Sequence, residues 1–132
     1  MINLKPLTYF VAIFAFSITA CNKSEKVADH TLLTGKWLRP DGGYILEIGE
    51  VDKDKKTTAK YFNPGGPINV ESAEISMNEI GNLSVTVVLQ DRGYPGSTYT
   101  LQYLADTDRL IGSYTQPASG QVYQVYFIRQ AP

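Results

Sequence analysis

The clearest structural signal in this sequence is the run Leu83-Ser84-Val85-Thr86-Val87-Val88-Leu89-Gln90. Its odd-numbered residues are all apolar, and three of its four even-numbered residues are polar. This period of two is typical of a β-strand that buries one face, because successive side chains of a strand point to opposite sides. Similar alternation occurs at 44–49 and at 98–103. No stretch between Gly35 and the C-terminus has a convincing helical period, so the sequence predicts an all-β domain.

Short runs of this kind fill the chain from Gly35 onward, separated by turn sequences such as Pro40-Asp41-Gly42 and Tyr94-Pro95-Gly96. We expect eight strands, at 35–39, 43–51, 57–63, 68–77, 82–90, 97–104, 109–116 and 121–129. Links of hairpin length between them favour up-and-down antiparallel pairing. Such a sheet can close into an eight-stranded barrel, which removes its exposed edges. A two-sheet sandwich is the alternative.

Two of the expected strands have an irregular apolar pattern. In the fourth, the apolar residues up to Val70 share one parity, whereas Ala73, Ile75 and Met77 share the other. One extra residue near Glu71-Ser72, a β-bulge, would keep both sets facing the core. The last strand is apolar on both parities, so the pattern leaves its inward face open, and its spare apolar face could meet a partner, the tether or lipid.

The first and last strands carry Gly35-Lys36-Trp37 and Arg129. These residues resemble the calycin pattern of lipocalins, fatty-acid-binding proteins and avidins. The resemblance implies that Trp37 plugs the closed end of the barrel and that Arg129 packs across its ring, while Gly35 lets the backbone pass close by. Arg39 is a rival for this cation position. Because avidins line their site with several tryptophans and this chain has one, biotin is not expected.

The N-terminus has the features of a secretory signal peptide. Lys5 precedes an apolar run, 7–18, which is too short for a comfortable membrane-spanning helix. The run ends at Ile18-Thr19-Ala20-Cys21, which resembles the lipobox of bacterial lipoproteins. The resemblance implies cleavage after Ala20 and acyl chains, palmitate among them, on Cys21. An ordinary signal peptide with an incidental cysteine is the alternative.

We therefore expect a signal peptide at 1–20, a lipidated Cys21 with a flexible tether at 21–33, and the barrel at 34–130. Two or three acyl chains would hold the protein stably on a membrane that it does not span. Asn22, rather than Asp, follows the cysteine, which by analogy with enterobacterial sorting favours the outer membrane over the inner, with the barrel facing the periplasm.

Composition excludes several classes of function. The 132 residues carry a net charge of −1, so no basic surplus points to nucleic acid. One cysteine allows neither an internal disulfide nor a multi-cysteine zinc site. The only histidine, His30, lies in the expected tether, away from any base or metal role. We expect a monomer.

Enzymatic readings find little support in the residues. Nucleophilic catalysis needs a base beside Ser or Cys, but Cys21 is expected to carry lipid and the only histidine lies in the expected tether. Glu47, Glu71 and Glu74 lie in strands, but their parity mostly faces outward. Asp52-Lys53-Asp54 and Asp106-Thr107-Asp108 fit hairpin turns better than calcium loops. We therefore expect no catalytic residues, no metal and no cofactor.

Tyrosines are the best candidates for a binding site. Five of them fall on the parities assigned to the barrel interior: Tyr44, Tyr61, Tyr99, Tyr103 and Tyr114. Buried hydroxyls need partners, so this set predicts a polar network, ordered water or a polar ligand, unless the hydroxyls simply reach the rim. In the loop at 91–97, Arg92 and Tyr94 are residue types favoured at interaction hot spots, although Tyr94 could instead fold over the barrel mouth.

Two functions remain open. One is a barrel that binds a small ligand non-covalently. A cavity above about 300 Å³ would favour this function. The other is a protein-interaction, inhibitor or assembly module of the cell envelope. A filled interior and an apolar patch on the outside of the barrel would favour this function.

Overall fold

The computed structural model describes residues 29–132. The expected signal peptide, Cys21 and most of the expected tether lie outside the described residues. A one-turn 3-10 helix comes first, followed by nine strands: η1 (His30–Leu33), β1 (Gly35–Arg39), β2 (Tyr44–Val51), β3 (Thr57–Asn63), β4 (Gly66–Ile68), β5 (Val70–Met77), β6 (Leu83–Leu89), β7 (Thr98–Leu104), β8 (Arg109–Gln116) and β9 (Gln121–Arg129).

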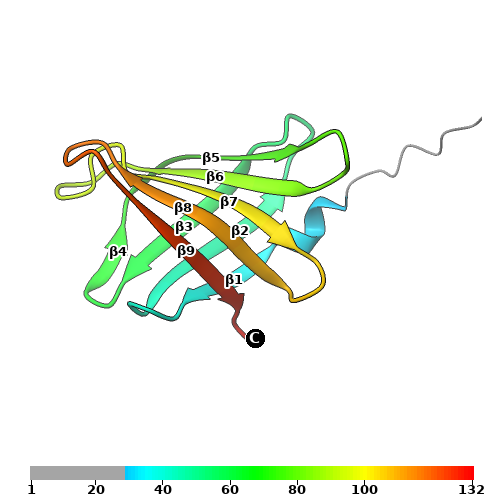
Figure 1. Cartoon of the computed structure of the whole chain (residues 1–132), viewed down its shortest axis with the longest axis horizontal. Helices are drawn as coiled ribbons and strands as arrows, with labels where there is room; N and C mark the ends of the chain where they lie inside the picture. Colours follow the sequence, from blue (N-terminus) through cyan, green and yellow to red (C-terminus); the bar gives the residue numbers. More distant parts are fainter. Residues whose placement is uncertain (1–28) are drawn as a thin grey trace, which may run out of the picture.

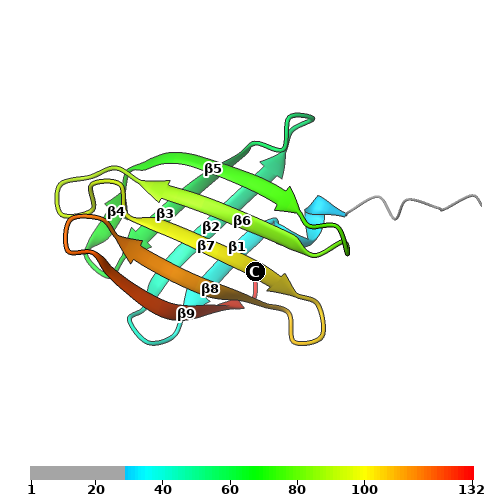
Figure 2. The same ribbon diagram turned by 45° about the horizontal axis from the view of Figure 1, so that its top comes forward.

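The strands form one antiparallel sheet in the order β4-β3-β2-β1-β9-β8-β7-β6-β5. Consecutive strands pair as hairpins, and β1 also pairs with β9, with Trp37 opposite Arg129. The sheet curls into a nearly closed barrel with η1 at one end (Figures 1 and 2). The predicted all-β barrel is confirmed, whereas the sandwich alternative is not, because all nine strands belong to a single sheet.

The ninth strand comes from a division of the segment expected as one strand at 68–77. Gly66–Ile68 pairs with β3, whereas Val70–Met77 pairs with β6, so β4 and β5 lie at opposite ends of the sheet order. Asn69 is the corner between them, and its carbonyl accepts a hydrogen bond from the Gln90 amide at 2.9 Å. When the segment changes its pairing partner, its side chains still alternate between the inside and the outside of the barrel. The apolar alternation alone therefore did not reveal that the segment divides into two strands.

The barrel is joined where β5 meets the start of β3. The amide of Ile75 donates to the carbonyl of Lys55 at 2.8 Å, and Lys56 forms an isolated bridge with Glu74. These contacts, together with the covalent corner at Asn69, cover much of the two edges that the sheet order would otherwise expose.

The predicted bulge is confirmed. Val70 lies opposite Leu89 and Ser72 lies opposite Val88, so Glu71 is the extra residue on β5. Ala73 and Ile75 then point inward and are buried. Met77 was expected to join them but is 41% exposed, because it is the last residue of β5 and lies at the end of the barrel.

The interior is filled through its middle by alternate side chains of every long strand. The structure also resolves the inward face of β9: Val125 and Phe127 are buried, whereas Val122 and Tyr126 are 59% and 43% exposed on the outside. The largest fully buried side chains are Trp37, Tyr61, Tyr99, Phe127, Leu33, Leu46, Ile48, Leu89, Leu101 and Leu110.

Candidate functional site

The two ends of the barrel differ in chemistry, and β1 connects them. Trp37 lies toward the end that carries η1, and Arg39, two residues later on the same inward parity, lies toward the other end. Trp37 is fully buried, and its Nε1 donates to the carbonyl of Leu33 at 2.9 Å. That carbonyl belongs to η1, so the last residues of the expected tether are folded against the barrel.

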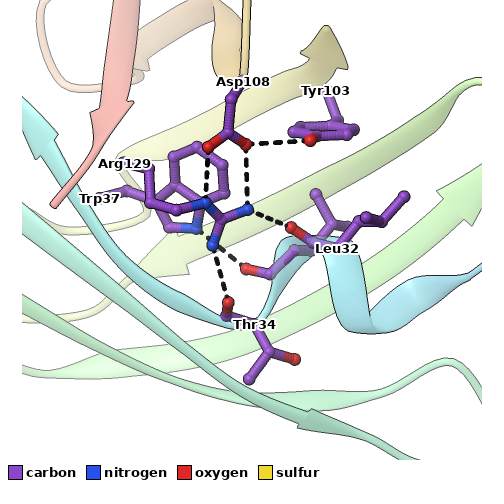
Figure 3. A network of polar contacts seen from close by, with 7 residues as sticks. Leu32, Thr34, Trp37, Tyr103, Asp108 and Arg129 are labelled. Carbon is purple, nitrogen blue, oxygen red and sulfur yellow. Dashed lines mark hydrogen bonds and ion pairs between the residues drawn. The ribbon is translucent and has the colours of Figure 1, made fainter. Parts of the chain in front are cut away.

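Arg129 covers the Trp37 ring, the position that the resemblance implied for it, with Cζ 4.2 Å from the ring centroid (Figure 3). Its Nη1 donates to the carbonyl of Thr34 at 3.0 Å, and its Nη2 donates to the carbonyl of Leu32. Nε donates to Oδ2 of Asp108 at 2.8 Å. Arg129 therefore links the start of the domain, the β7–β8 turn and the end of β9.

Charge and hydrogen bonding reinforce this cluster. The hydrogen bond from Arg129 lowers the pKa of Asp108 below its ordinary value, and the same bond raises the pKa of Arg129. Gly35 has a φ of +132°, and a Cβ there would lie 3.1 Å from Nη1 of Arg129. The structure thus brings together the three residues expected at the plug, Gly35, Trp37 and Arg129.

Tyr103, one of the five candidate ligand tyrosines, belongs to this plugged end instead. Its hydroxyl donates to Oδ1 of Asp108 at 2.9 Å (Figure 3), and its ring lies edge-on to Trp37 with centroids 6.1 Å apart. Parity placed Tyr103 inward correctly, but parity does not say toward which end of the barrel a residue lies.

The opposite mouth holds a cavity of about 310 Å³, which we call the tyrosine cavity. The other four candidate tyrosines line it. Its full lining is Arg39, Tyr44, Tyr61, Gly93, Tyr94, Tyr99, Tyr114, Gln116 and Tyr123.

Aromatic rings form the walls of the tyrosine cavity. Tyr44 and Tyr61 are stacked, with centroids 6.0 Å apart and planes 7° apart, and Tyr99 lies 4.5 Å from Tyr114. Tyr61 and Tyr99 are almost fully buried, and burial raises the pKa of both hydroxyls, so both are neutral phenols at pH 7.

Arg39 reaches into the tyrosine cavity from the end of β1. Its Nη1 donates to Oη of Tyr99 at 2.9 Å, and its Nε and Nη2 bind both carboxylate oxygens of Asp41 at 2.7 and 2.9 Å. Its Cζ lies 4.9 Å from the ring centroid of Tyr44 and 5.7 Å from that of Tyr114. Arg39 is therefore not the cation that covers Trp37.

The β6–β7 loop folds toward the mouth rather than away from it. Tyr94 lines the cavity, and its hydroxyl accepts a hydrogen bond from Nδ2 of Asn63 at 3.2 Å. Arg92 is exposed outside the cavity. Of the two readings of this loop, the fold-back of Tyr94 over the mouth is the observed one.

Three side chains of the lining, those of Arg39, Gln116 and Tyr123, were not predicted from the sequence as part of this site. Arg39 shares the parity of Trp37, and Tyr123 shares that of Val125, so both could have been assigned inward. Gln116 ends β8 on the parity of Tyr114. The sequence signal for these residues is a polar side chain near the end of a strand, on the same parity as the buried residues of that strand.

A wider groove of about 900 Å³ lies at the plugged end, between η1 and the β5–β6 turn, with Leu32, Met77 and Ile80 among its lining residues. It contains no buried polar network like that of the tyrosine cavity. Residues 29–132 include no cluster of three or more potential metal-ligating side chains of the His, Cys, Asp or Glu type. Nor does this range contain a helix with the length and hydrophobicity that a membrane crossing needs.

A scan against protein-family models gave no match, and searches of curated proteins and of solved structures gave no significant match either.

Proposed function

We propose that this protein is a bacterial envelope lipoprotein whose barrel binds a small ligand non-covalently in the tyrosine cavity. The observation that carries the proposal is the cavity itself, about 310 Å³ in volume and walled by aromatic rings with a few convergent polar groups. Small-molecule sites are concave and hold a few convergent polar groups, and their volumes begin at about 300 Å³. The Trp37–Arg129 contact supports a calycin-like barrel, closed at the other end.

A fragment screen tests ligand binding. The full chain in detergent micelles, with ¹³C-labelled tyrosine, is screened by NMR against small aromatic compounds. We expect hits that shift the signals of Tyr44, Tyr61 and Tyr114. Gln116→Trp, which fills the mouth, removes these hits, whereas Gln124→Trp on the exposed face of β9 retains them. A screen without cavity hits, or hits indifferent to Gln116→Trp, would refute ligand binding.

Membrane attachment is a separate part of the proposal. Lipid on Cys21 would hold the barrel on the periplasmic side of a membrane, the outer membrane by preference, without a spanning segment. Mass spectrometry of the protein from detergent-solubilised membranes should find a chain that begins at Cys21 and carries acyl groups. Cys21→Ser should remain unprocessed, and an unmodified cysteine in the wild type would contradict the anchor.

The proposed role is binding rather than catalysis, by a monomer without a cofactor. A second candidate, an interaction module of the envelope, is favoured by one observation: Ile111 and Tyr126 lie opposite each other on the outer face of β8 and β9, 45% and 43% exposed, with Val122 nearby on β9. Cross-linking in intact cells distinguishes the two. An interaction module would lose its cross-linked envelope partner with Ile111→Lys and keep it with Gln116→Trp.

A further inference from the structure

The polar groups inside the tyrosine cavity form one short chain. Arg39 donates from Nη1 to the hydroxyl of Tyr99, and that hydroxyl lies 2.7 Å from the hydroxyl of Tyr61. Tyr61 is 1% exposed and Tyr99 is fully buried. The hydroxyls therefore depend for their hydrogen bonds on each other, on Arg39 and on whatever occupies the cavity.

This series of hydrogen bonds, from Arg39 through Tyr99 to Tyr61, has more donors than acceptors. The two phenols carry two protons, and their mutual hydrogen bond uses one of them, whichever phenol donates. Arg39 has no acceptor to offer the other proton. Within residues 29–132 no other acceptor is bonded to either hydroxyl, so one O–H of this pair, which lines the cavity, has no acceptor among the described residues.

Arg39 adds further donors. A guanidinium has five N–H groups. In the described structure Asp41 takes two of those of Arg39 and Tyr99 takes one, which leaves two. The cavity lining includes no carboxylate, because Asp41 lies outside it with its side chain 57% exposed. The occupant that satisfies these groups has to supply acceptors.

Aromatic rings can also attract a cation. Here the faces of Tyr44 and Tyr114 already have the Arg39 guanidinium over them, at 4.9 and 5.7 Å. A second cation would meet the guanidinium at close range, whereas an anion would be attracted to it, although Asp41 offsets part of this positive charge from outside the cavity. The arrangement therefore disfavours ammonium ligands and favours a negatively charged acceptor.

The walls also restrict the body of the ligand. The rings of Tyr44, Tyr61, Tyr99 and Tyr114 line the cavity, so the body of a ligand would contact aromatic carbon. A volume of about 310 Å³ has room for a small molecule and none for a long acyl chain in full. A single ring that carries a carboxylate meets both demands, because its faces suit the tyrosines and its oxygens accept from the donor cluster.

We propose that the tyrosine cavity binds a small aromatic carboxylate, whose carboxylate accepts hydrogen bonds from Arg39 and from the Tyr61–Tyr99 pair. This inference rests on the proposed ligand-binding function and specifies the chemical class of the ligand.

Three probes of similar size and different charge test the class: benzoate, benzamide and benzyltrimethylammonium. Each is titrated at pH 7 into the full chain in detergent micelles, and the tyrosine signals are followed by NMR. We expect benzoate to bind at least tenfold more tightly than benzamide, because hydrogen bonds to a charged acceptor are about twice as strong as neutral ones. Benzyltrimethylammonium should bind most weakly.

Variants identify the donors. Tyr61→Phe keeps the ring and removes one hydroxyl, and we expect it to weaken benzoate binding roughly 2- to 12-fold. Arg39→Gln should weaken it at least about tenfold. Tyr126→Phe and Arg109→Gln are matched controls, because Arg109 lies 5.4 Å over the ring of Tyr126 outside the cavity. Trp37 fluorescence verifies that each variant is folded, and Tyr61→Phe tests the proposal if Arg39→Gln does not fold.

The outcomes separate this inference from the function on which it rests. Cavity shifts by benzamide or by the cation at affinities equal to that of benzoate would overturn the carboxylate and leave a ligand-binding barrel. Benzoate binding that Tyr61→Phe and Arg39→Gln leave unchanged would overturn the assigned donors. Failure of all three probes, while the fragment screen has other cavity hits, would also refute the carboxylate. Failure of the probes and the screen together would refute the proposed function itself.

Discussion

Arg39 and Arg129 show how position gives one residue type two roles. Each guanidinium lies over an aromatic ring and binds an aspartate, Asp41 in one case and Asp108 in the other. Arg129 also donates to the backbone carbonyls of Leu32 and Thr34, so it is a structural clamp that ties the start of the domain to its end. Arg39 has donors left over at the edge of a cavity, so it is available to a ligand.

The first prediction concerns Asp108, the acidic partner in that clamp. Asp108→Asn should lower the free energy of unfolding at pH 7 by about 1 kcal/mol, because a partly exposed, charge-assisted pair is lost. Asn suits the site sterically, since Asp108 has a φ of 49° and Asn also tolerates the left-handed region. Urea unfolding at several pH values measures the difference.

The difference between wild type and Asp108→Asn should depend on pH. The pKa of Asp108 is lower in the folded protein than its ordinary value of 3.8, so the folded state favours the carboxylate. The Asp108 carboxylate therefore makes its full contribution to the free energy of unfolding above about pH 4. This contribution is lost as the pH falls through the pKa of Asp108 in the folded protein. Asp106→Asn, in the same turn but exposed, should change little at any pH. A gap between the wild type and Asp108→Asn that persists at the lowest pH would contradict this account.

At the residue scale, the sequence predicted one half of the clamp. Gly35, Trp37 and Arg129 could be named from the sequence because their types and positions on the first and last strands resemble the calycin pattern. Asp108 could not, because Asp106-Thr107-Asp108 has the composition of an ordinary hairpin turn. Which aspartate of a turn reaches a distant arginine depends on the turn's backbone geometry, and Asp108 is the one with positive φ.

At the scale of single strands, alternation predicted most inward faces but failed where both faces are apolar. In β6 every odd-numbered residue from Leu83 to Leu89 is buried, as its pattern predicted. In β9 the outward residues Val122 and Tyr126 are also hydrophobic, so only the pairing with β8 decides which row is inside. A strand that is apolar on both faces has no contrast from which parity can be read.

The second prediction tests the orientation of β9. Phe127→Ala should destabilise the protein by about 3–5 kcal/mol, because it empties a fully buried position beside the ring of Tyr99. Tyr126→Ala removes an equally large ring from the half-exposed outer row and should cost far less. Denaturant unfolding curves compare the two. Equal losses would mean that the inward row of β9 is assigned incorrectly.

The third prediction concerns Gly112 in β8, where two strands come very close. A Cβ at this position would lie 1.9 Å from the carbonyl oxygen of Thr100 on β7, and a backbone atom cannot move aside as a flexible side chain can. Gly112→Ala should therefore destabilise the barrel by about 1–3 kcal/mol or more. Ser113→Ala, at the next position of the same strand, is the control, and thermal melts of the two variants give the comparison. A Gly112→Ala protein as stable as the control would mean that β7 and β8 can separate at little cost.

At the scale of the whole molecule, the barrel is a filled cylinder with one clamped end and one hollowed mouth. Short links predicted the antiparallel pairing of neighbouring strands, and the resemblance of the first and last strands to the calycin pattern favoured closure. They did not predict how the five inward tyrosines divide between the ends, four at the cavity and Tyr103 at the clamp. That division depends on strand tilt and register, which bring Tyr61 and Tyr99 together although 38 residues separate them.

The last prediction follows from burying those two phenols in the folded barrel. Burial raises the pKa of Tyr61 and of Tyr99 above the ordinary 10.0, so above that pH the folded state holds protons that the unfolded chain releases. Stability should therefore be fully present below pH 10 and fall as the pH rises further, by about 1.4 kcal/mol per pH unit for each such tyrosine.

Phenolate absorbance should then rise in two stages, the later one together with the change in Trp37 fluorescence that marks unfolding. Tyr61→Phe should make the alkaline loss less steep, whereas Tyr126→Phe on the outer face should not. A smooth rise in absorbance with Trp37 still buried would show that the two hydroxyls ionise inside the folded barrel.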